Sequence, residues 1–270
     1  MSGRVAGKVA VVTGAGRGQG RSHAVVLASE GADVVVLDAC TEYDTIGYSM
    51  ATEEDLHETA RQVEQLGQRA VAIKVDVRDR ANLQNAIDEA VQKLGRLDIV
   101  VANAGVCSWQ TWDNTSEELW RDTLDVNLTG AWNTMTAGAK HLIAAGGGSI
   151  IAISSTAGSK GLPFLAPYVA SKHGLVGVAN ALANELAIHH IRVNTVHPAG
   201  VNTPLITQNR GSLEPMIANN PDLGPVFMNA LPVDLLESID VSNAVLYLAS
   251  DESRYVTGLQ LKVDAGAANR

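Results

Sequence analysis

The chain has few aromatic side chains, and its 270 residues include only two cysteines, Cys40 and Cys107. Two cysteines outside any CxxC pair exclude a disulfide-stabilised scaffold, and we expect both to be small, buried thiols. Because aromatic residues make up only 4% of the chain, Val, Ile, Leu and Ala must fill the core. That composition favours buried parallel strands packed closely against helices.

Positive charge and long apolar runs are also scarce. With 20 basic against 29 acidic residues the net charge is −9, which argues against nucleic acid and anionic membranes as partners. No apolar run reaches the roughly 18 residues of a membrane helix, and glycines interrupt the apolar stretch near the N-terminus. We therefore expect a cytoplasmic protein without a membrane partner. No cluster of His and Cys has metal-ligand spacing, so we expect no metal site.

Short β-branched runs alternate with helical patterns along the whole chain. The expected strands are Lys8–Thr13, Asp33–Asp38, Ala70–Val75, Asp98–Ala102, Gly148–Ser154, Ile191–Val196 and Leu259–Val263. The expected helices are Gln19–Glu30, Glu53–Leu66, Arg80–Leu94, Glu117–Ala145, Ala166–His189 and Val241–Ala249. Repeated strand–helix–strand units imply right-handed crossovers and a parallel sheet. We predict an α/β fold, a single Rossmann-like doubly wound domain over residues 1–270, with about seven strands and helices on both faces.

One long segment, about Pro198–Ser238, shows neither pattern and contains several prolines. We expect it to be irregular and to act as a substrate lid, because unstructured loops of this length in compact domains usually bind ligands or cover them. Met216, Phe227 and Met228 lie in this segment and are expected to form an apolar cover over the substrate.

A glycine-rich turn, Thr13–Gly20, joins the first expected strand to the first expected helix. Glycine lets the backbone turn sharply and approach a ligand closely, and the helix N-terminus that follows offers free N–H groups to a pyrophosphate. The spacing is T-G-x-x-x-G-x-G, which is neither the strict G-x-G-x-x-G pattern nor a P-loop. The turn predicts a dinucleotide site with contacts from Gly14, Arg17, Gly18, Gln19 and Gly20.

The residue that ends the second expected strand indicates which dinucleotide binds. Asp38 stands 18 residues after Gly20, where a carboxylate accepts hydrogen bonds from the adenosine ribose and repels a 2′-phosphate. Arg17 is a counter-signal, because a cation in the turn favours a 2′-phosphate. We give Asp38 more weight and predict NAD as the cofactor, with NADP less favoured.

Five motifs occur in an order that resembles the short-chain dehydrogenase/reductase family. They are the turn Thr13–Gly20, the triplet Asn103-Ala104-Gly105, Asn127 in D-V-N-L, Ser155 placed 13 residues before the Y-x-x-x-K of Tyr168 and Lys172, and Y-V-T-G at 255–258. Each motif is weak alone, but the ordered set is specific and spans essentially the whole chain. The resemblance implies hydride transfer between NAD and a secondary alcohol or its ketone.

Tyr168 and Lys172 are four residues apart, so on a helix they lie on the same side. A cation about 4 Å from the phenol, at an effective dielectric near 20, would lower its pKa from about 10 by roughly three units. We expect Tyr168 to act as general base in oxidation and general acid in reduction. The resemblance adds Ser155 as a donor to the substrate oxygen and Asn127 as the seat of a proton-relaying water. It also assigns the nicotinamide ribose to Lys172.

Further cofactor contacts are implied at the carboxyl ends of the expected strands, where open α/β sheets bind ligands. They come from Asp76, Val77, Asn103, Ala104, Gly105, Val201 and Thr203, with Tyr168 and Lys172 shared with catalysis. Asp76 and Val77 are expected to face the adenine. Val201 and Thr203 are expected to hold the nicotinamide carboxamide.

The segment Ala39–Met50 is longer than a strand-to-helix connection needs. It resembles the actinobacterial carveol-dehydrogenase-like branch, which is associated with the redox peptide mycofactocin and is thought to hold NAD very tightly. Tyr43, Ile46, Tyr48 and Met50 supply enough apolar surface to cover a purine, so we expect the segment to fold over the adenosine and slow cofactor release. An enzyme that traps NAD would need an external redox carrier.

The features together predict an NAD-dependent oxidoreductase that interconverts a secondary alcohol and its ketone, on a hydrophobic, terpenoid- or steroid-like substrate. Trp109 and Trp112 are expected to line the substrate pocket. One alternative is an NADPH-dependent 3-oxoacyl carrier ketoreductase, and another, of a different class, is a catalytically inactive NAD-binding sensor. The family's subunit interface involves the helices equivalent to Glu117–Ala145 and Ala166–His189, which implies a homotetramer.

Overall fold

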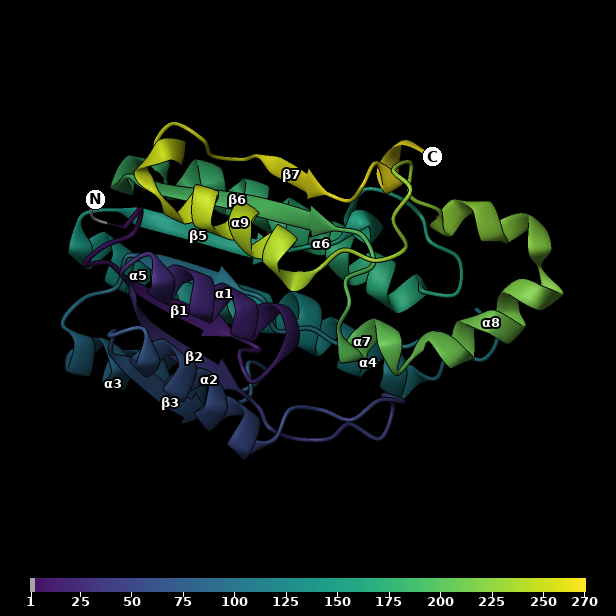
Figure 1. Ribbon diagram of the computed structural model, residues 1–270, viewed down its shortest axis with the longest axis horizontal. Helices are drawn as coiled ribbons and strands as arrows, with labels where there is room; N and C mark the ends of the chain where they lie inside the picture. Colours follow the sequence, from purple (N-terminus) through teal and green to yellow (C-terminus); the bar gives the residue numbers. More distant parts are fainter. Residues whose placement is uncertain (1–2) are drawn as a thin grey trace.

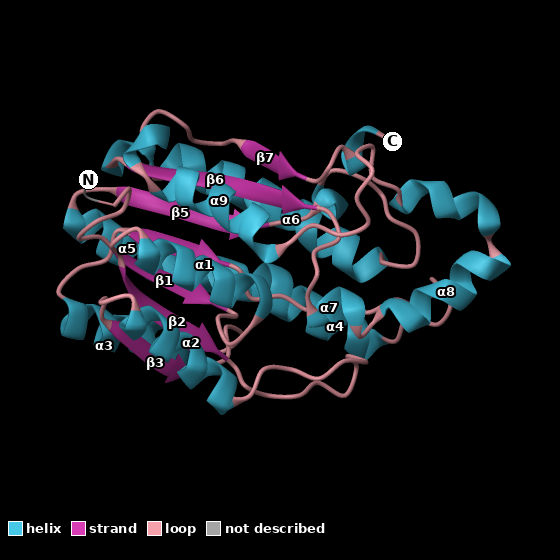
Figure 2. Cartoon of the chain, viewed as in Figure 1, coloured by secondary structure: helices cyan, strands magenta, loops and turns pink. Residues whose placement is uncertain are grey.

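The computed structural model describes residues 3–270 and is built around one parallel sheet of seven strands. The strands are β1 (Val9–Thr13), β2 (Asp33–Asp38), β3 (Ala70–Lys74), β4 (Ile99–Ala102), β5 (Gly148–Ile153), β6 (Ile191–Pro198) and β7 (Gln260–Val263). Their order in the sheet is β3-β2-β1-β4-β5-β6-β7, and every neighbouring pair is parallel (Figure 2). The predicted doubly wound fold is therefore confirmed.

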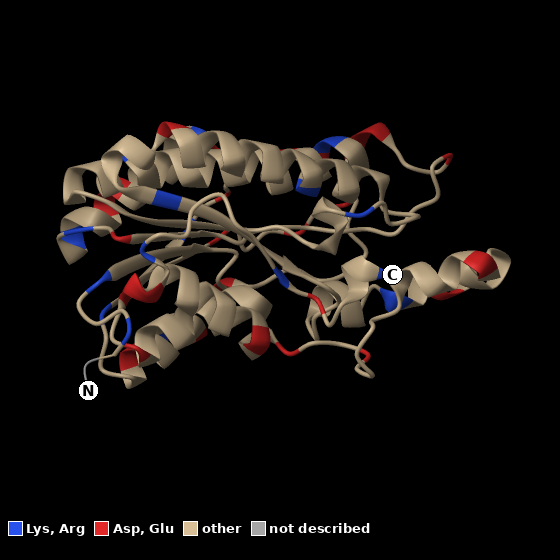
Figure 3. Cartoon of the chain, turned by 90° about the horizontal axis from the view of Figure 1, so that it is seen from above, with Lys and Arg blue, Asp and Glu red and all other residues tan. Residues whose placement is uncertain are grey.

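Helices cover both faces of the sheet, which lies between two helical layers when seen from above (Figure 3). One layer holds α1 (Gly18–Ser29), α2 (Glu53–Gln65) and α9 (Ser238–Ala249). The other holds α3 (Arg80–Leu94), α4 (Glu117–Leu124), α5 (Ala131–Ala145) and α6 (Ala166–Glu185). Alternate residues of β1 supply the two cores, since Val12 packs toward α1 while Val11 packs toward α3 and α5. Burial on both faces explains why the central strands are apolar throughout.

The edge strands depart from this pattern. The central strand β1 is buried at every position, whereas β3 is mostly half-buried and β7 alternates between exposed and half-buried residues. Each edge strand has a neighbour on one side only. The expectation of strands buried on both faces is therefore wrong for the two edges.

Two of the expected helices are interrupted. A π-turn over Asp125–Gly130 separates α4 from α5 within the expected helix Glu117–Ala145. Such turns insert one residue into the helical repeat and are frequent at functional sites. The expected helix Ala166–His189 ends at Glu185, and a 3₁₀ turn follows over Ala187–His189.

The segment expected to be irregular, Pro198–Ser238, contains helices. They are α7 (Pro204–Thr207), α8 (Arg210–Asn219) and a 3₁₀ helix over Pro221–Phe227. Pro204 and Pro221 stand in the first turn of their helices, where the missing N–H of proline leaves no bond unmade. In Figure 1 these helices project beyond the carboxyl ends of the strands.

Charges are scattered over the surface, with Lys and Arg interspersed among Asp and Glu (Figure 3). Among residues 3–270, no helix has the length and apolarity needed to cross a bilayer. The same residues contain no group of three or more His, Cys, Asp or Glu side chains arranged to hold a metal ion.

Candidate active site

The glycine-rich turn between β1 and α1 leaves little room for side chains. Gly14 and Gly18 have φ angles of +64° and +55°. A Cβ atom on Gly14 would lie 2.8 Å from Cα of Ala104, and one on Gly20 would lie 2.0 Å from the carbonyl oxygen of Gly14. Helix α1 begins without a side-chain cap and without an acidic residue in its first turn. The turn therefore presents free N–H groups and the positive end of a helix dipole, as an anion site requires.

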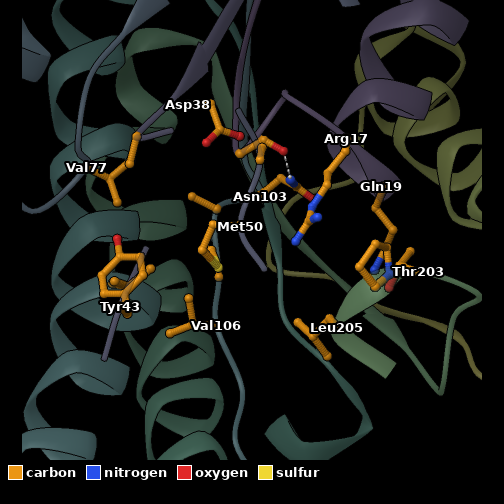
Figure 4. Close-up of a pocket in the computed structure, with 18 of the residues that line it drawn as sticks. Arg17, Gln19, Asp38, Tyr43, Met50, Val77, Asn103, Val106, Thr203 and Leu205 are labelled. Atoms are coloured by element: carbon orange, nitrogen blue, oxygen red, sulfur yellow. Dashed lines mark hydrogen bonds between the residues drawn. The ribbon is translucent and has the colours of Figure 1, made fainter. Parts of the chain in front are cut away.

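A cavity opens beside this turn, at the carboxyl ends of β1, β2 and β4 (Figure 4). We call it the glycine-turn cavity. Asp38, Tyr43 and Val77 lie on one side of it, and Arg17, Gln19 and Thr203 lie on the other. The predicted cofactor residues that line it are Gly14, Arg17, Gly18, Gln19, Asp38, Val77, Asn103, Ala104, Gly105 and Thr203. This edge of the sheet is the point where strand order reverses, between β1 and β4.

The carboxylate of Asp38 is held in place by the main chain. Its Oδ2 atom accepts a hydrogen bond from the N–H of Gly16 at 2.9 Å, and its Oδ1 atom accepts one from the N–H of Cys40 at 3.1 Å. The guanidinium of Arg17 donates to the carbonyl of Ser49. The cation that competes with Asp38 in cofactor choice is thus engaged with the Ala39–Met50 segment.

Asp76 is paired with a neighbouring cation. It does not line the glycine-turn cavity, and its carboxylate accepts hydrogen bonds from Nε and Nη2 of Arg78 at 2.9 and 2.7 Å. The Arg78 guanidinium in turn lies 4.6 Å from the ring centre of Tyr43. Arg78 thus shares the carboxylate, and the expected contact of Asp76 with the adenine stays a prediction.

Two other predicted cofactor residues also lie outside this cavity. Gly20 packs under the turn, where the close carbonyl of Gly14 leaves no space for a Cβ atom. Val201 lines a second cavity, described below, together with Tyr168.

Lys172 is buried, with 3% of its surface exposed, and its Nζ atom donates to the carbonyl of Ile153 at 2.8 Å. The same Nζ lies 5.5 Å from the ring centre of Tyr168. Burial lowers the pKa of Lys172 to about 8. Gly105 is close to this amine as well, since a Cβ atom on it would lie 3.6 Å from Nζ.

The expected effect of Lys172 on Tyr168 is not what this arrangement produces. Burial, reinforced by the Cys107 thiol, raises the pKa of the Tyr168 phenol above its usual range, and only the Ser155 hydroxyl lowers it. The free-energy cost of removing a phenolate from water is larger than its attraction to the Lys172 amine, whose own pKa is lowered. The prediction of a phenol shifted downward by Lys172 is therefore wrong for the protein without a cofactor.

Asn127 is buried in the π-turn, and both polar atoms of its side chain are hydrogen-bonded. Its Oδ1 atom accepts from the N–H of Val106 at 2.8 Å, while Nδ2 donates to the carbonyl of Val106 at 2.9 Å and to the hydroxyl of Ser171 at 3.2 Å. The side chain thus fixes the chain just after Gly105. Its role as the seat of a proton-relaying water stays a prediction.

His197 is a site residue that sequence reasoning missed. It is fully buried, and burial lowers its pKa, so its ring is neutral. Nδ1 donates to the carbonyl of Ser155 at 2.9 Å, and Nε2 accepts from the hydroxyl of Thr195 at 2.8 Å. The ring therefore fixes the backbone that carries Ser155. The available signal was its position at the carboxyl end of an expected strand.

A second cavity, which we call the apolar cavity, contains Ser155 and Tyr168. Its apolar walls include Trp109, Leu165 and Phe227, and the rings of Trp109 and Phe227 meet edge to face at 5.6 Å. The lining from the expected lid also includes Leu205, Ile206, Leu213 and Val226, and Met216 packs in the cluster behind it.

Two expected pocket residues point elsewhere. Trp112 is 86% exposed and Met228 is 53% exposed, and neither lines the apolar cavity. Trp112 stands in the loop before α4, where its side chain extends into solvent. Met228 follows the 3₁₀ helix that ends at Phe227, and its side chain is exposed to solvent.

The two cavities meet at Gln19, Thr203 and Leu205, which line both. At this junction the Oε1 atom of Gln19 is buried and has no hydrogen-bond partner among residues 3–270. Buried acceptors are nearly always satisfied, so the atom marks the place of a missing donor. The glycine cradle, the helix N-terminus, the fixed Asp38 carboxylate and this orphaned oxygen fit a dinucleotide that runs from the turn to the apolar cavity.

Comparison with known proteins identifies the class. Residues 8–213 match the family model described as short chain dehydrogenase, and the chain belongs to this family. It is 47% identical to (−)-trans-carveol dehydrogenase of Rhodococcus erythropolis over 272 residues, which cover 97% of this chain and 98% of that protein.

Two solved structures are similar over nearly the full length. A short chain dehydrogenase from Mycobacterium paratuberculosis bound to NAD superposes with a TM-score of 0.97 at 47% identity, covering 99% of this chain and 100% of that one. Carveol dehydrogenase from Mycobacterium avium in complex with NAD gives a TM-score of 0.94 at 46% identity, with 99% and 100% covered. The comparisons confirm the predicted family, its carveol-dehydrogenase-like branch and the oxidoreductase class.

Proposed function

We propose that the protein interconverts a hydrophobic secondary alcohol and its ketone, with NAD as hydride acceptor or donor. The observation that carries this proposal is the junction of the two cavities. Ser155 and Tyr168 lie in an apolar cavity that meets the glycine-turn cavity at Gln19, Thr203 and Leu205. A substrate held in one cavity thereby lies next to the reactive end of a dinucleotide held in the other.

Each catalytic side chain has a proposed task that its surroundings permit. The Oγ atom of Ser155 accepts from the N–H of Ala157 at 3.1 Å, which leaves its own proton free for the substrate oxygen. Tyr168 takes the proton of the alcohol and returns it to the ketone. Bound NAD would accept the hydride, and its positive ring would lower the pKa of the nearby phenol. Lys172 holds the nicotinamide ribose, and Asn127 positions the Gly105–Val106 chain.

The choice of NAD over NADP rests on Asp38 and Arg17. The carboxylate of Asp38 is fixed at the cavity wall, where it repels a 2′-phosphate. The guanidinium of Arg17 is bound to Ser49 and is less available to attract that phosphate. The two NAD-bound structures of similar proteins support the same choice. This argues against the NADPH-dependent ketoreductase.

A terpenoid-like alcohol is the proposed substrate class. The apolar cavity is lined by aromatic and aliphatic side chains, and its cations are engaged: Lys160 donates to two carbonyls, and Arg210 pairs with Asp234 at 2.9 Å. A compact, uncharged ring alcohol fits such walls better than a long charged acyl carrier. The similarity to carveol dehydrogenases supports this class.

The Ala39–Met50 segment is the proposed cover of the adenosine. Tyr43, Ile46 and Tyr48 are buried, and Tyr43, Tyr48 and Met50 line the glycine-turn cavity. Apolar surface buried against the adenosine slows dissociation of NAD. If the cofactor stays bound between turnovers, an external redox carrier such as mycofactocin must reoxidise it. The tetramer and the cytoplasmic location also stay predictions, and fractionation of cells would test the latter.

The experiment compares two matched substitutions in purified holoprotein, Tyr168→Phe and Tyr255→Phe. Tyr255 is 89% exposed, so its variant controls for the loss of a hydroxyl. With (−)-trans-carveol and a reoxidising dye, we expect turnover to fall about 100- to 10,000-fold in Tyr168→Phe and to be unchanged in Tyr255→Phe. NAD released on denaturation should be equal in all three proteins.

Other results would overturn the proposal in distinct ways. Nicotinamide reduction at the wild-type rate in a single turnover of Tyr168→Phe would remove Tyr168 from catalysis. Tighter binding of NADPH than of NADH would favour the carrier ketoreductase. Bound NAD without turnover of any terpenoid or steroid alcohol would favour the sensor.

A further inference from the structure

Two segments that are far apart in the sequence cover the two cavities. We call Ala39–Met50 the cofactor-side cover and residues 204–227 the substrate-side cover. In Figure 1 the loop after β2 runs outward to the region of α7, and hydrogen bonds place the two covers in contact. The connection involves two consecutive residues of each cover, 48–49 of the first and 208–209 of the second.

The buried connection passes through one residue of the β4–α4 loop, Cys107. Its N–H donates to the Tyr48 hydroxyl at 3.3 Å, and its carbonyl accepts from Nδ2 of Asn209 at 3.0 Å. Cys107, Tyr48 and Asn209 are 2%, 6% and 3% exposed. Because all three are shielded from water, a broken bond leaves a buried polar group without a partner.

An exposed connection runs in parallel. The hydroxyl of Ser49 donates to Oε1 of Gln208 at 3.1 Å, and the carbonyl of Ser49 accepts from Arg17 in the glycine-rich turn. Both Ser49 and Gln208 are exposed, so water can replace their bond at little cost. The buried connection is therefore the one that holds the two covers together.

Tyr48 lines the glycine-turn cavity, whereas Asn209 lines neither this cavity nor the apolar one. Asn209 touches Cys107 from the substrate side, and Tyr48 touches it from the cofactor side. A change at Asn209 therefore reaches the cofactor through this joint and not by direct contact with the cavity. Leu205, four residues earlier, lines both cavities, so the substrate-side cover is also in place to sense either ligand.

We propose that Asn209 is a positioning residue that locks Tyr48 over the cofactor, so that the two covers open and close as one unit. Opening the substrate-side cover breaks the bond of Asn209 to Cys107 and frees Tyr48. A closed substrate-side cover keeps the cofactor in place. The inference rests on the proposed NAD function and adds a coupling between cofactor retention and the substrate cover.

The test measures the release of NADH from the holoprotein by stopped-flow fluorescence, with excess NAD to prevent rebinding. Asn209→Leu keeps the number and branching of the side-chain heavy atoms and removes the donor, and Asn219→Leu makes the same change at the exposed end of α8. We expect about five- to tenfold faster release in Asn209→Leu and the wild-type rate in Asn219→Leu. In Tyr48→Phe/Asn209→Leu the acceleration should be smaller than the product of the two single effects, because both act on one joint.

Coupling is reciprocal, so a second measurement reads it from the other side. NADH should protect the amides of residues 204–219 from hydrogen exchange in the wild type, and Tyr48→Phe should lose most of that protection. This measurement decides the matter if Asn209→Leu does not fold. Wild-type release in folded Asn209→Leu, multiplicative effects in the double variant, or unchanged protection in Tyr48→Phe would each overturn the coupling while leaving NAD binding intact. Failure of the wild type to bind NADH would overturn the proposed function itself.

Discussion

At the scale of single residues, burial shifts the pKa values of the proposed catalytic pair, Tyr168 and Lys172. Lys172 and Tyr168 lie on one helix face as their spacing requires. In the protein without a cofactor, burial raises the pKa of Tyr168 and lowers that of Lys172, so the ionised form of each is disfavoured. The Lys172 amine donates one hydrogen bond to the carbonyl of Ile153. Its burial disfavours the charged ammonium form, because that form loses its hydration. Lys172, for which we propose a role in the active site, therefore destabilises the fold when it is charged.

The Lys172→Met variant should separate stability from activity. The pKa of Lys172 is about 8 in the folded chain against its ordinary value of 10.5, so below pH 8 the native state carries the full cost of a buried ammonium. That difference corresponds to roughly 3 kcal/mol, offset in part by about 1 kcal/mol for the bond to Ile153.

We expect Lys172→Met to be inactive and to melt at a higher temperature than the wild type at pH 7. The advantage should shrink as pH rises from 8 toward 10.5, because the folded wild type has then lost the proton of Lys172 while the unfolded chain still holds it. Above pH 10.5 the lysine is neutral in both states and the cost of its burial as a cation is gone. Thermal unfolding at pH 7 and pH 10 checks this. A variant less stable than the wild type at pH 7 would show that the hydrogen bond of Lys172 outweighs its desolvation.

At the scale of elements, the contact between α1 and α9 depends on a buried histidine. His23 is fully buried, and its Nδ1 lies 2.8 Å from the hydroxyl of Ser242. Its Nε2 has no hydrogen-bond partner in the part of the chain that the structure describes. Ser242 donates its own proton to the carbonyl of Ser238 at 2.9 Å, so Nδ1 of His23 is the donor. Burial lowers the pKa of His23 to about 3.

The buried His23 predicts that the free energy of unfolding decreases in acid. Between the unfolded pKa of 6.5 and the folded value of about 3, the unfolded chain binds a proton that the native state refuses. Stability is therefore lost as pH falls, by roughly 2 kcal/mol at pH 5 relative to neutral pH.

Urea unfolding at pH 7 and pH 5 tests the prediction with two variants. His23→Leu should lose less stability than the wild type over this interval, whatever its stability at pH 7. His189→Leu, at an exposed position, should behave as the wild type. Equal losses in wild type and His23→Leu would assign the acid sensitivity to other groups.

At the scale of the whole molecule, α4 and α5 carry large apolar side chains that one subunit does not cover. Trp120, Trp132 and Ile143 are 41%, 37% and 40% exposed. Water contact with so much indole surface is unfavourable, and association of subunits is the usual remedy. We expect a homotetramer in which these helices meet those of another subunit.

Light scattering at micromolar concentration measures the assembly. The wild type should have the mass of four chains, and Trp132→Glu should give a smaller species, because a carboxylate would be buried in the interface. Leu66→Glu, a similarly exposed position (43%) at the end of α2, should leave the mass unchanged. A monomeric wild type would contradict the prediction.

The sequence predicts those features of the molecule that depend on interactions between residues close together in the chain. The seven strands and the glycine-rich turn were predicted because apolar periodicity and glycine spacing are local signals. The π-turn around Asn127 was missed, since the apolar pattern continues from α4 into α5 across it. Helix α7 was missed because Pro204 in its first turn resembles a proline in a loop, and α8 was missed because it contains Pro215, a residue that usually interrupts a helix.

The order of strands and helices, the site at the carboxyl ends of β1, β2 and β4, and the side chains available there can all be read from the amino-acid sequence. The hydrogen-bond partner of each side chain and its exposure to water depend on the folded chain. Arg78 binds Asp76, burial reverses the expected shift of Tyr168, and Cys107 joins Tyr48 to Asn209 across 59 and 102 residues of chain. Desolvation and hydrogen-bond partners depend on how distant segments pack, and no local pattern records that packing.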